Sequence, residues 1–411
     1  MPSALYRRAA CTWLLAALLC AGGANQARSA QTAEVVCDNG VGRFSTEYST
    51  GVTVSVGPVR NAAFSGRACE AKFSWKKEDV VVVPQTAEID IDVLGADLGV
   101  GQPVVAFQTR KTAIDPLAQY DIYTLEKPPR KLRTLTGGST YRAADTDLDG
   151  KVEIWTNDAA AVNGFEGLPL SAIDFPPTIV LRLEHQRVID VSSEFQSEYD
   201  RQIAQLRAQL SPQNLADFKN NDGKLTNRFS LPESQVRALI ATKVRILEIV
   251  WAYLYSGRED EAWKTLRELW PTADLDRIHA AIANTRTSGV HGNLDGVSQS
   301  RPRSRLKHAL IYDAQSELAK DDHLSAFSTD TIPQEIVLRR PPPSYTATAV
   351  LNTEAVLNLV IDAAGKVRSA KAEGKPDQEL IDATVDWKFI PAFKTGHPVA
   401  CRMRFGVTPY K

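Results

Sequence analysis

The C-terminal part of the chain, from Pro341 onward, carries the pattern that most restricts how this chain folds. Every second residue from Leu357 to Ile361 is a large aliphatic side chain, which is the period of a strand with one buried face. The run Asp362-Ala-Ala-Gly365 that follows has turn-forming residues at both ends. An apolar helical pattern begins after Asp377, and alternation returns from Val399 to Val407. The order strand, turn, strand, helix, strand predicts a small α+β unit.

Several motifs inside this unit occur together in one known family. They are an apolar helix face, a Trp-x-Phe-x-Pro-Ala motif and a Gly-x-Pro-Val turn, formed by Leu380, Ile381, Ala383, Val385, Trp387, Phe389, Pro391 and Gly396. With the preceding Asp/Gly turn, this arrangement resembles the C-terminal domain of TonB-type periplasmic energy transducers. Thr346 and Ala355 replace a proline and a glycine that are usual in the pattern, and neither change threatens the fold.

The resemblance implies a role in binding another protein rather than in chemistry. A small sheet of this kind has an edge strand, and an edge can accept a strand from another chain through main-chain hydrogen bonds. In the transducers, such a module captures a receptor peptide in this way or pairs with a second module. We expect the final strand to be this edge, with Arg402, Arg404, Phe405 and Val407 as the binding residues.

The N-terminus has the three parts of a secretory signal peptide. Arg7-Arg8 precedes an apolar run from Ala9 to Ala21, and Gly22-Gly-Ala24 supplies small residues for cleavage. The apolar run is shorter than the roughly 20 residues that span a bilayer. We expect residues 1–24 to be removed and the protein to be periplasmic or secreted. An uncleaved N-terminal anchor is the alternative.

Three cysteines remain after such a cleavage, and two of them are a natural pair. Cys37 and Cys69 both lie in a β-rich stretch, and an oxidising compartment favours their pairing as a disulfide. Closing a loop of that length stabilises by roughly 3 kcal/mol in the chain-entropy model. Cys401 alternates with apolar residues of the final strand, so we expect a buried, unreactive side chain there.

Residues 25–190 are expected to form a β-rich domain. The run Val80–Val83 indicates a short buried strand, and Ile89–Val93 alternates between apolar and acidic residues. An acidic turn followed by an apolar strand occurs twice, from Asp92 and from Ala144. This spacing resembles the blade-sized repeats of FG-GAP β-propellers, which need at least four blades to close. The region has room for about three, so we expect a compact antiparallel sandwich or a truncated repeat unit.

The run Asp145-Thr-Asp147-Leu-Asp149-Gly150 has the spacing of a cation-binding loop. Carboxylates at alternate positions converge when the chain turns tightly, and the glycine allows that turn. The carbonyl of Lys151 and the carboxylate of Glu153 would complete an oxygen cage suited to calcium. Because Thr156 stands where an EF-hand has a bidentate glutamate, the loop instead resembles the calcium loops of FG-GAP blades. We expect a structural calcium ion held by these residues, with an ion-free acidic turn as the alternative.

A helical region, residues 191–288, is expected to follow. Helical patterns run from Ser192 to Leu210, from Val236 to Leu254 and from Ala262 to Trp270. The last two patterns, joined at Gly257, resemble the helical hairpin of a tetratricopeptide repeat. Because at least three such hairpins are usually needed for a superhelix, we expect this lone hairpin to pack on a neighbouring part of the chain.

Residues 289–340 are expected to be a partly ordered linker. This segment contains a basic stretch from Arg301 to Lys307 and a pattern for a short helix around Ala309–Leu318. The predicted fold is therefore α+β and multidomain: a β-rich domain, a helical hairpin region, this linker, and a TonB-like module over residues 341–411.

Catalytic signatures are scarce. Ser74-Trp-Lys-Lys77 and Lys394-Thr-Gly396 match the S-x-x-K and K-T-G motifs of serine β-lactamases and penicillin-binding proteins. Alternation around Ser74 predicts a strand, however, which would place the serine and the lysine on opposite faces. The chain has 48 basic and 49 acidic residues, so its balanced charge provides no general attraction for nucleic acid.

We therefore expect an exported, non-enzymatic protein-binding or scaffold protein of the cell envelope. Its partner would be another envelope protein or peptide, or a second copy of the module, bound by β-strand addition. Two alternatives remain open. The first is a membrane-anchored, TonB-type energy transducer for outer-membrane transport. The second, more remote, is a serine acyl-transfer enzyme.

Overall fold

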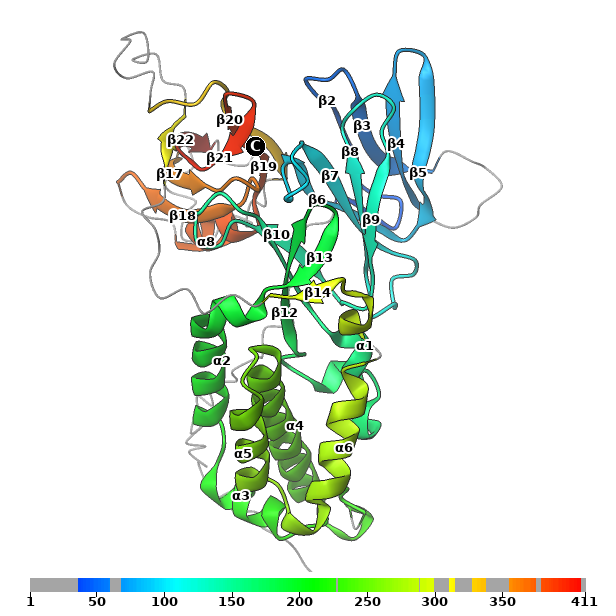
Figure 1. Ribbon diagram of the computed structural model, residues 1–411, viewed down its shortest axis with the longest axis vertical. Helices are drawn as coiled ribbons and strands as arrows, with labels where there is room; N and C mark the ends of the chain where they lie inside the picture. Colours follow the sequence, from blue (N-terminus) through cyan, green and yellow to red (C-terminus); the bar gives the residue numbers. More distant parts are fainter. Residues whose placement is uncertain are drawn as a thin grey trace, which may run out of the picture. The chain divides into compact units, whose positions relative to one another are not determined.

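The computed structural model confirms the predicted α+β class. Sheets come first in the chain, helices occupy the middle, and a mixed sheet ends it (Figure 1). The structure describes residues 36–59, 68–226, 228–287, 289–298, 310–314, 327–337, 355–374 and 378–407. The predicted signal peptide, the basic stretch from Arg301 and the helix cap Asp377 lie outside these residues.

Three antiparallel sheets, each a meander of four consecutive strands, form the N-terminal region (Figure 1). We name them the first, second and third sheets. In chain order their strands are β2 (Phe44–Glu47), β3 (Thr53–Pro58), β4 (Cys69–Trp75), β5 (Glu78–Thr86); β6 (Glu88–Ala96), β7 (Val104–Arg110), β8 (Gln119–Thr124), β9 (Lys131–Leu135); and β10 (Tyr141–Ala144), β11 (Glu153–Asn157), β12 (Thr178–Glu184), β13 (Arg187–Asp190). Short strands extend two of these sheets, β1 (Cys37–Asp38) beside β6 and β14 (Gly296–Val297) beside β13.

The second sheet is buried on both faces, because its strands alternate between two cores. Ile91 and Phe107 pack with the first sheet, whereas Val93 and Ala106 pack with the third sheet and the helices. The stack explains the repeat seen in the sequence. Asp97 lies in the turn after β6 and the acidic loop lies in the turn after β10, so both occupy the first turn of successive meanders.

The disulfide Cys37–Cys69 is present, as predicted. It joins β1, which extends the second sheet, to β4 of the first sheet, so it ties two layers of the stack together. Both cysteines are fully buried. Cys401 is also buried, and burial raises the pKa of its thiol to about 12, which agrees with the expected unreactive side chain.

The prediction that Val80–Val83 is buried is wrong for its first half. Val80 and Val81 are 43% and 48% exposed, and only Val83 is buried. These residues belong to β5, the last strand of the first sheet, which pairs with β4 and with no other strand in the described part of the chain. A continuous apolar run cannot distinguish a central strand from such a terminal one.

The middle of the chain is helical, as predicted. Its elements are α1 (Ala159–Val162), η1 (Phe165–Gly167), η2 (Leu170–Ala172), η3 (Ser192–Phe195), α2 (Gln196–Ala208), α3 (Pro212–Lys219), η4 (Arg228–Ser230), α4 (Glu233–Tyr255), α5 (Glu259–Leu269), η5 (Thr272–Asp274), α6 (Leu275–Thr285) and η6 (Val290–Asn293). The expected hairpin is α4–α5, and Gly257 between them has the left-handed φ of 77° that favours glycine. Within the described part, none of these helices combines the length and apolar content that a membrane span requires.

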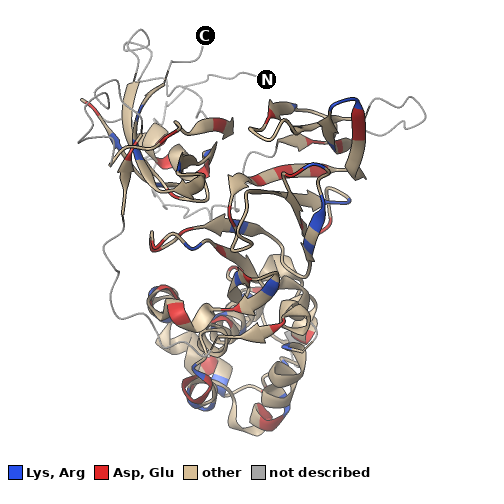
Figure 2. Ribbon diagram, turned by 45° about the horizontal axis from the view of Figure 1, so that its top comes forward, with Lys and Arg blue, Asp and Glu red and all other residues tan. Residues whose placement is uncertain are grey.

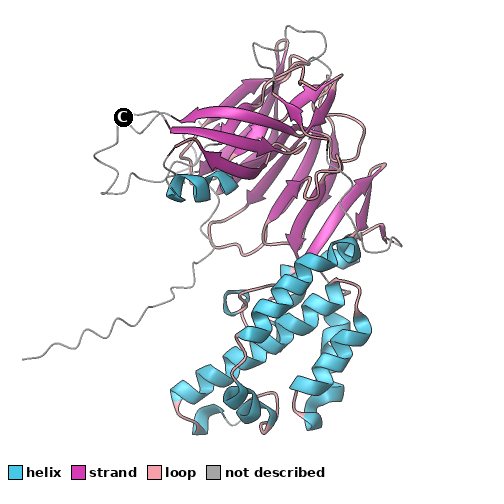
Figure 3. Ribbon diagram, turned by 90° about the vertical axis from the view of Figure 1, so that its left-hand side faces the viewer, coloured by secondary structure: helices cyan, strands magenta, loops and turns pink. Residues whose placement is uncertain are grey.

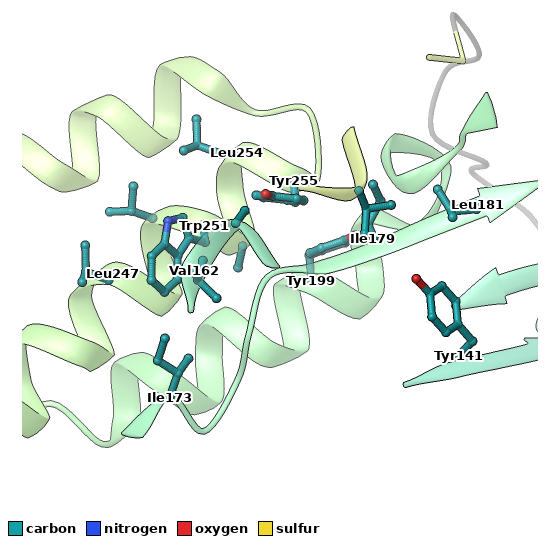
Figure 4. Close-up of a cluster of buried hydrophobic side chains, with 14 of the residues drawn as sticks. Tyr141, Val162, Ile173, Ile179, Leu181, Tyr199, Leu247, Trp251, Leu254 and Tyr255 are labelled. Atoms are coloured by element: carbon teal, nitrogen blue, oxygen red, sulfur yellow. The ribbon is translucent and has the colours of Figure 1, made fainter. Parts of the chain in front are cut away.

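The helices pack together against the third sheet (Figure 3). Trp251 and Leu247 of α4 face the same core as Tyr199 of α2 and Ile179 of β12 (Figure 4). The hairpin thus packs on neighbouring parts of the chain, as expected: on α2, α3 and α6 as well as on β12.

The C-terminal module consists of β17 (Ala355–Ile361), β18 (Val367–Ala372), α8 (Gln378–Ala383), η9 (Thr384–Asp386), β19 (Lys388–Ile390), β20 (Ala392–Lys394), β21 (His397–Val399) and β22 (Cys401–Val407). Leu357, Leu359 and Ile361 are buried, and Gly365 adopts a left-handed turn conformation, as predicted. Val385 was expected on the apolar helix face but is 49% exposed, because α8 ends before it.

Two short strands from the predicted linker join this module. β15 (Tyr312–Asp313) pairs in parallel with the start of β22, and β16 (Gln334–Val337) pairs with β19. Over residues 310–314 the expected short helix is therefore wrong. The main sheet has the order β15-β22-β17-β18, so the expectation of an open edge at β22 is wrong for its start, where β15 covers Cys401 and Arg402.

Candidate functional site

The acidic loop brings three of its five predicted ligands together. Carboxylate oxygens of Asp145, Asp147 and Asp149 all lie within 4.8 Å of one another, a spacing that can hold a metal ion. The Asp145 carboxylate accepts hydrogen bonds from the backbone N–H groups of Asp149 (3.0 Å) and Gly150 (2.9 Å). Gly150 has a φ of 83°, which supplies the tight turn that the spacing predicted.

Of the other two predicted ligands, Glu153 lies beside the loop and also faces a cation, and its second carboxylate oxygen accepts from the backbone N–H of Thr146 (3.5 Å). Glu153 is fully buried in β11, and its carboxylate lies 2.7 Å from the guanidinium of Arg182, which also pairs with Glu194. The side chain of Lys151 is exposed, and its backbone N–H donates to Asp149. Arg182 on the neighbouring strand β12 thus engages the carboxylate that the spacing alone assigned to the ion.

Crowding of carboxylates perturbs the electrostatics of the loop. Burial raises the pKa of Asp145 to about 7, and the charges of Asp362, Glu153 and Asp149 act in the same direction. Burial also raises the pKa of Glu153 to about 7, although Arg182 opposes the shift. A bound cation would relieve this repulsion, because it stabilises the charged form of every nearby carboxylate.

Two hydrogen bonds connect the C-terminal module to the acidic loop. The backbone N–H of Asp145 donates to a carboxylate oxygen of Asp362 (3.1 Å), and Arg368 donates to the carbonyl of Thr146 (3.0 Å). The other oxygen of Asp362 accepts from the N–H groups of Ala364 and Lys366 in its own turn. The predicted hairpin turn of the module therefore also contacts the acidic loop.

Two buried ion pairs fix the module to the second sheet. Lys366 lies 2.6 Å from Asp92, with side chains 2% and 3% exposed, and Lys388 pairs with Asp90. Asp92 also accepts hydrogen bonds from the hydroxyl of Tyr120 and from the N–H of Ala143, both at 2.7 Å. The sequence patterns did not predict that Lys366 and Lys388 would pair with these aspartates. The available signal was two aspartates alternating with isoleucine in a buried strand, since buried charges need partners.

The four predicted binding residues of β22 lie on two faces. Arg402 and Arg404 are exposed on the outer face, whereas Val407 is buried and Phe405 packs edge-on against Trp387. Arg404 pairs with Glu373 (2.9 Å) and Arg402 lies 3.8 Å from Asp313 of β15. Phe405 and Val407 thus belong to the core of the module.

β18 is a terminal strand of the module sheet with one open side. In the β17–β18 pair, the N–H of Glu373 donates to Val356, so odd-numbered residues of this strand direct their backbone groups toward β17. Ala370 and Ala372 consequently direct their N–H and C=O groups away from the sheet. Among the described residues, no strand pairs with β18 on that side.

The outer face of this sheet carries polar side chains in register. Lys371, Asn358 and Arg404 are cross-strand neighbours, and a concavity of about 440 Å³ lies over them and over parts of all four strands. The inner face carries Ala370 and Ala372, which pack with Leu380 of α8. A strand added beside β18 would meet the polar face on one side and the helix on the other.

The enzyme-like motifs are placed as the strand pattern predicted. Ser74 lies in β4, and Lys77 lies in the turn after it. Lys394-Thr-Gly396 forms the turn between β20 and β21, where Lys394 donates to the carbonyl of Ser328 (2.7 Å). Acidic and basic residues are interspersed over the described helices and sheets (Figure 2).

Comparison with known proteins adds no assignment. No family model matches the chain, and no curated protein or solved structure matches it. A function therefore has to be inferred from the residues and contacts described above.

Proposed function

We propose that this chain is an exported protein-binding or scaffold protein of the cell envelope, which acts by binding rather than by catalysis. It binds another envelope protein by β-strand addition to its C-terminal module. The observation that carries the proposal is the edge strand β18, in which Ala370 and Ala372 direct backbone donors and acceptors outward. The resemblance of the module to TonB C-terminal domains supports the same mode of binding.

The way the module is held supports a fixed binding platform. The module contacts the second sheet through Lys366 and Lys388, and it contacts the third sheet through the turn at Asp362. The turn with Lys366 directly precedes β18, so these contacts lie near the start of that strand. Within the described residues, the far end of β18, from Ala370 onward, makes no such contact. A partner strand could therefore add there while the module stays docked, with no ordering cost for the platform itself.

Two observations support a location outside the cytoplasm. The disulfide Cys37–Cys69 persists in oxidising compartments, and the N-terminal residues have the composition of a secretory leader. We infer that the mature protein works in the periplasm or outside the cell. The exported form is thus the one to use in binding experiments.

Substituting Ala370 by proline is expected to weaken partner binding by at least about tenfold. Proline removes the outward N–H of the edge and places a ring in the path of an added strand. The measurement is recovery of cross-linked envelope proteins by the Ala370→Pro protein and by the wild type, at equal amounts of folded protein.

The matched control is Ala370→Val, which keeps the N–H and has a high strand propensity. Proteins recovered with the wild type and with Ala370→Val, but lost with Ala370→Pro, are strand-addition partners. Equal recovery with all three proteins would contradict binding at this edge.

We infer in addition that the acidic loop holds calcium in a structural role. Support comes from the all-oxygen character of the cluster, since carboxylate oxygens suit hard cations such as calcium. The loop sits between a strand of the third sheet and the turn of the module, so an ion there would stiffen the place where the two meet.

Calcium is expected to raise the melting temperature of chelator-treated protein, and Asp147→Ala is expected to abolish that rise. At ten times the dissociation constant, the stabilisation is about 1.4 kcal/mol. Asp97→Ala is the control, because Asp97 occupies the matching turn of the second sheet, where its carboxylate accepts three backbone N–H groups. A wild-type melting temperature that calcium does not change would contradict calcium binding in this loop.

A further inference from the structure

The chemistry of the strand that β18 accepts can be deduced from its neighbours. Over Val367–Ala372, β18 carries two exposed cations, Arg368 and Lys371, and no acidic residue. Arg368 is engaged with the carbonyl of Thr146 in the acidic loop. Lys371 is exposed on the outer face, and in the described part of the chain no carboxylate pairs with it. The edge therefore presents a positive charge that a partner can meet.

A second copy of the module is a poor occupant of this edge. Two β18 strands side by side would bring Arg368 and Lys371 of each copy to the same edge. The next carboxylate along the chain, Glu373, already pairs with Arg404 and so does little to offset them. Like charges across a strand pair are destabilising, and opposite charges are favourable. Charge complementarity thus favours a different chain that supplies carboxylates.

Side-chain alternation fixes where those carboxylates must stand. Residues on the outer side of an added strand lie beside Ser369 and Lys371, and residues on its inner side lie beside Ala370 and Ala372, toward α8 and η9. The inner neighbours are apolar, and η9 carries Val385, which is 49% exposed. Acidic residues therefore suit one side of the partner strand, and aliphatic residues suit the other.

The same sheet already contains one strand of this kind at its opposite edge. In β15, Asp313 lies on the outer face, 3.8 Å from Arg402, while Tyr312 packs into the core of the module. The chain's own segment thus lies beside the basic Arg402 with an acidic residue on the outer face and an apolar residue on the inner face.

We propose that the partner of this protein is an extended segment in which acidic and aliphatic residues alternate, bound along β18 with its carboxylates beside Lys371. The proposal rests on strand addition at the module, as proposed above, and names the partner class for it. Alternation distinguishes this segment from a generally acidic peptide, because consecutive carboxylates would place every second one on the apolar side of the sheet.

The test is binding of three synthetic peptides to the full exported chain, measured by fluorescence anisotropy. The peptides are an alternating Asp/Val sequence, a sequence of the same composition with all aspartates consecutive, and an alternating Lys/Val sequence. We expect the wild type to bind the first at least about tenfold more tightly than the other two. Lys371→Glu should reverse the preference in favour of the Lys/Val peptide.

Lys111→Glu is the control, because Lys111 is an exposed lysine in the turn after β7. It should leave the preference unchanged. The proposal is overturned if both Lys371→Glu and Ala370→Pro still bind the Asp/Val peptide with the wild-type preference. If Ala370→Pro abolishes binding but Lys371→Glu keeps the wild-type preference, strand addition stands and the acidic partner is wrong. If Lys371→Glu removes binding and Ala370→Pro does not, charge recognition stands and strand addition is wrong.

Discussion

Replacing Asp92 by alanine is expected to lower the free energy of unfolding by about 3–5 kcal/mol. Asp92 and Lys366 are 3% and 2% exposed, so the ammonium group of Lys366 would remain buried without its counter-ion. The hydroxyl of Tyr120 and the N–H of Ala143 would also lose an acceptor. Because the pair joins the module to the second sheet, the loss should appear as destabilisation of the docked module.

Denaturant unfolding of Asp92→Ala and of the double variant Asp92→Ala/Lys366→Met measures this effect. The double variant should recover part of the loss, because it removes the buried charge together with its partner. Arg201→Ala serves as a surface control, since Arg201 and Glu198 form an exposed pair on α2. A loss below about 1 kcal/mol for Asp92→Ala would mean that the pair is not buried in solution.

Removal of the disulfide is expected to lower the free energy of unfolding by about 3 kcal/mol. The double variant Cys37→Ala/Cys69→Ala reopens a loop that spans a sequence separation of 32 and removes the covalent link between the first and second sheets. Comparison of its denaturant midpoint with that of the wild type, with and without a reducing agent, measures the effect.

Two comparisons make the disulfide result specific. The reducing agent should shift the wild type and leave the double variant unchanged, because the variant has no bond to reduce. Cys401→Ala should retain the redox response of the wild type, since Cys401 is a buried free thiol. A wild type whose stability does not respond to reduction would contradict the pairing.

Features with local causes could be predicted from the sequence. Alternation alone identifies the buried positions of β17, because every second side chain of a strand faces the same way. The acidic loop could also be predicted, since its three carboxylates and its glycine lie within six residues of chain. The apolar stripe of α4 predicts the helix, although consecutive residues from Ile246 to Ala252 are all buried, which a stripe on one face does not predict.

Features that depend on distant partners could not be predicted. Lys366 and Asp92 are 274 residues apart in the chain, and Lys388 and Asp90 are 298 apart, so no local spacing links them. For the same reason the ion pair of Glu153 with Arg182 could not be predicted, because Arg182 reaches it from the next strand. The cover over the start of β22 could not be predicted either, because β15 comes from the predicted linker.

The contacts also relate the two proposed roles. The acidic loop, the turn at Asp362 and the start of β18 form one continuous region, joined by the hydrogen bonds of Asp145 and Arg368. An ion in the loop would therefore stabilise the end of the module opposite to the one that accepts a partner. On this account calcium supports the platform, and the far end of β18 performs the binding.

Hydrogen exchange at the amides of Ala370 and Ala372 tests the central claim most directly. In the free protein these two N–H groups point away from β17 and should exchange quickly, in contrast to those of Ser369 and Lys371. Addition of the alternating Asp/Val peptide should slow both by at least about tenfold, as new main-chain hydrogen bonds form. Exchange at Ala370 and Ala372 that stays fast while the peptide is bound would show that no strand adds at β18.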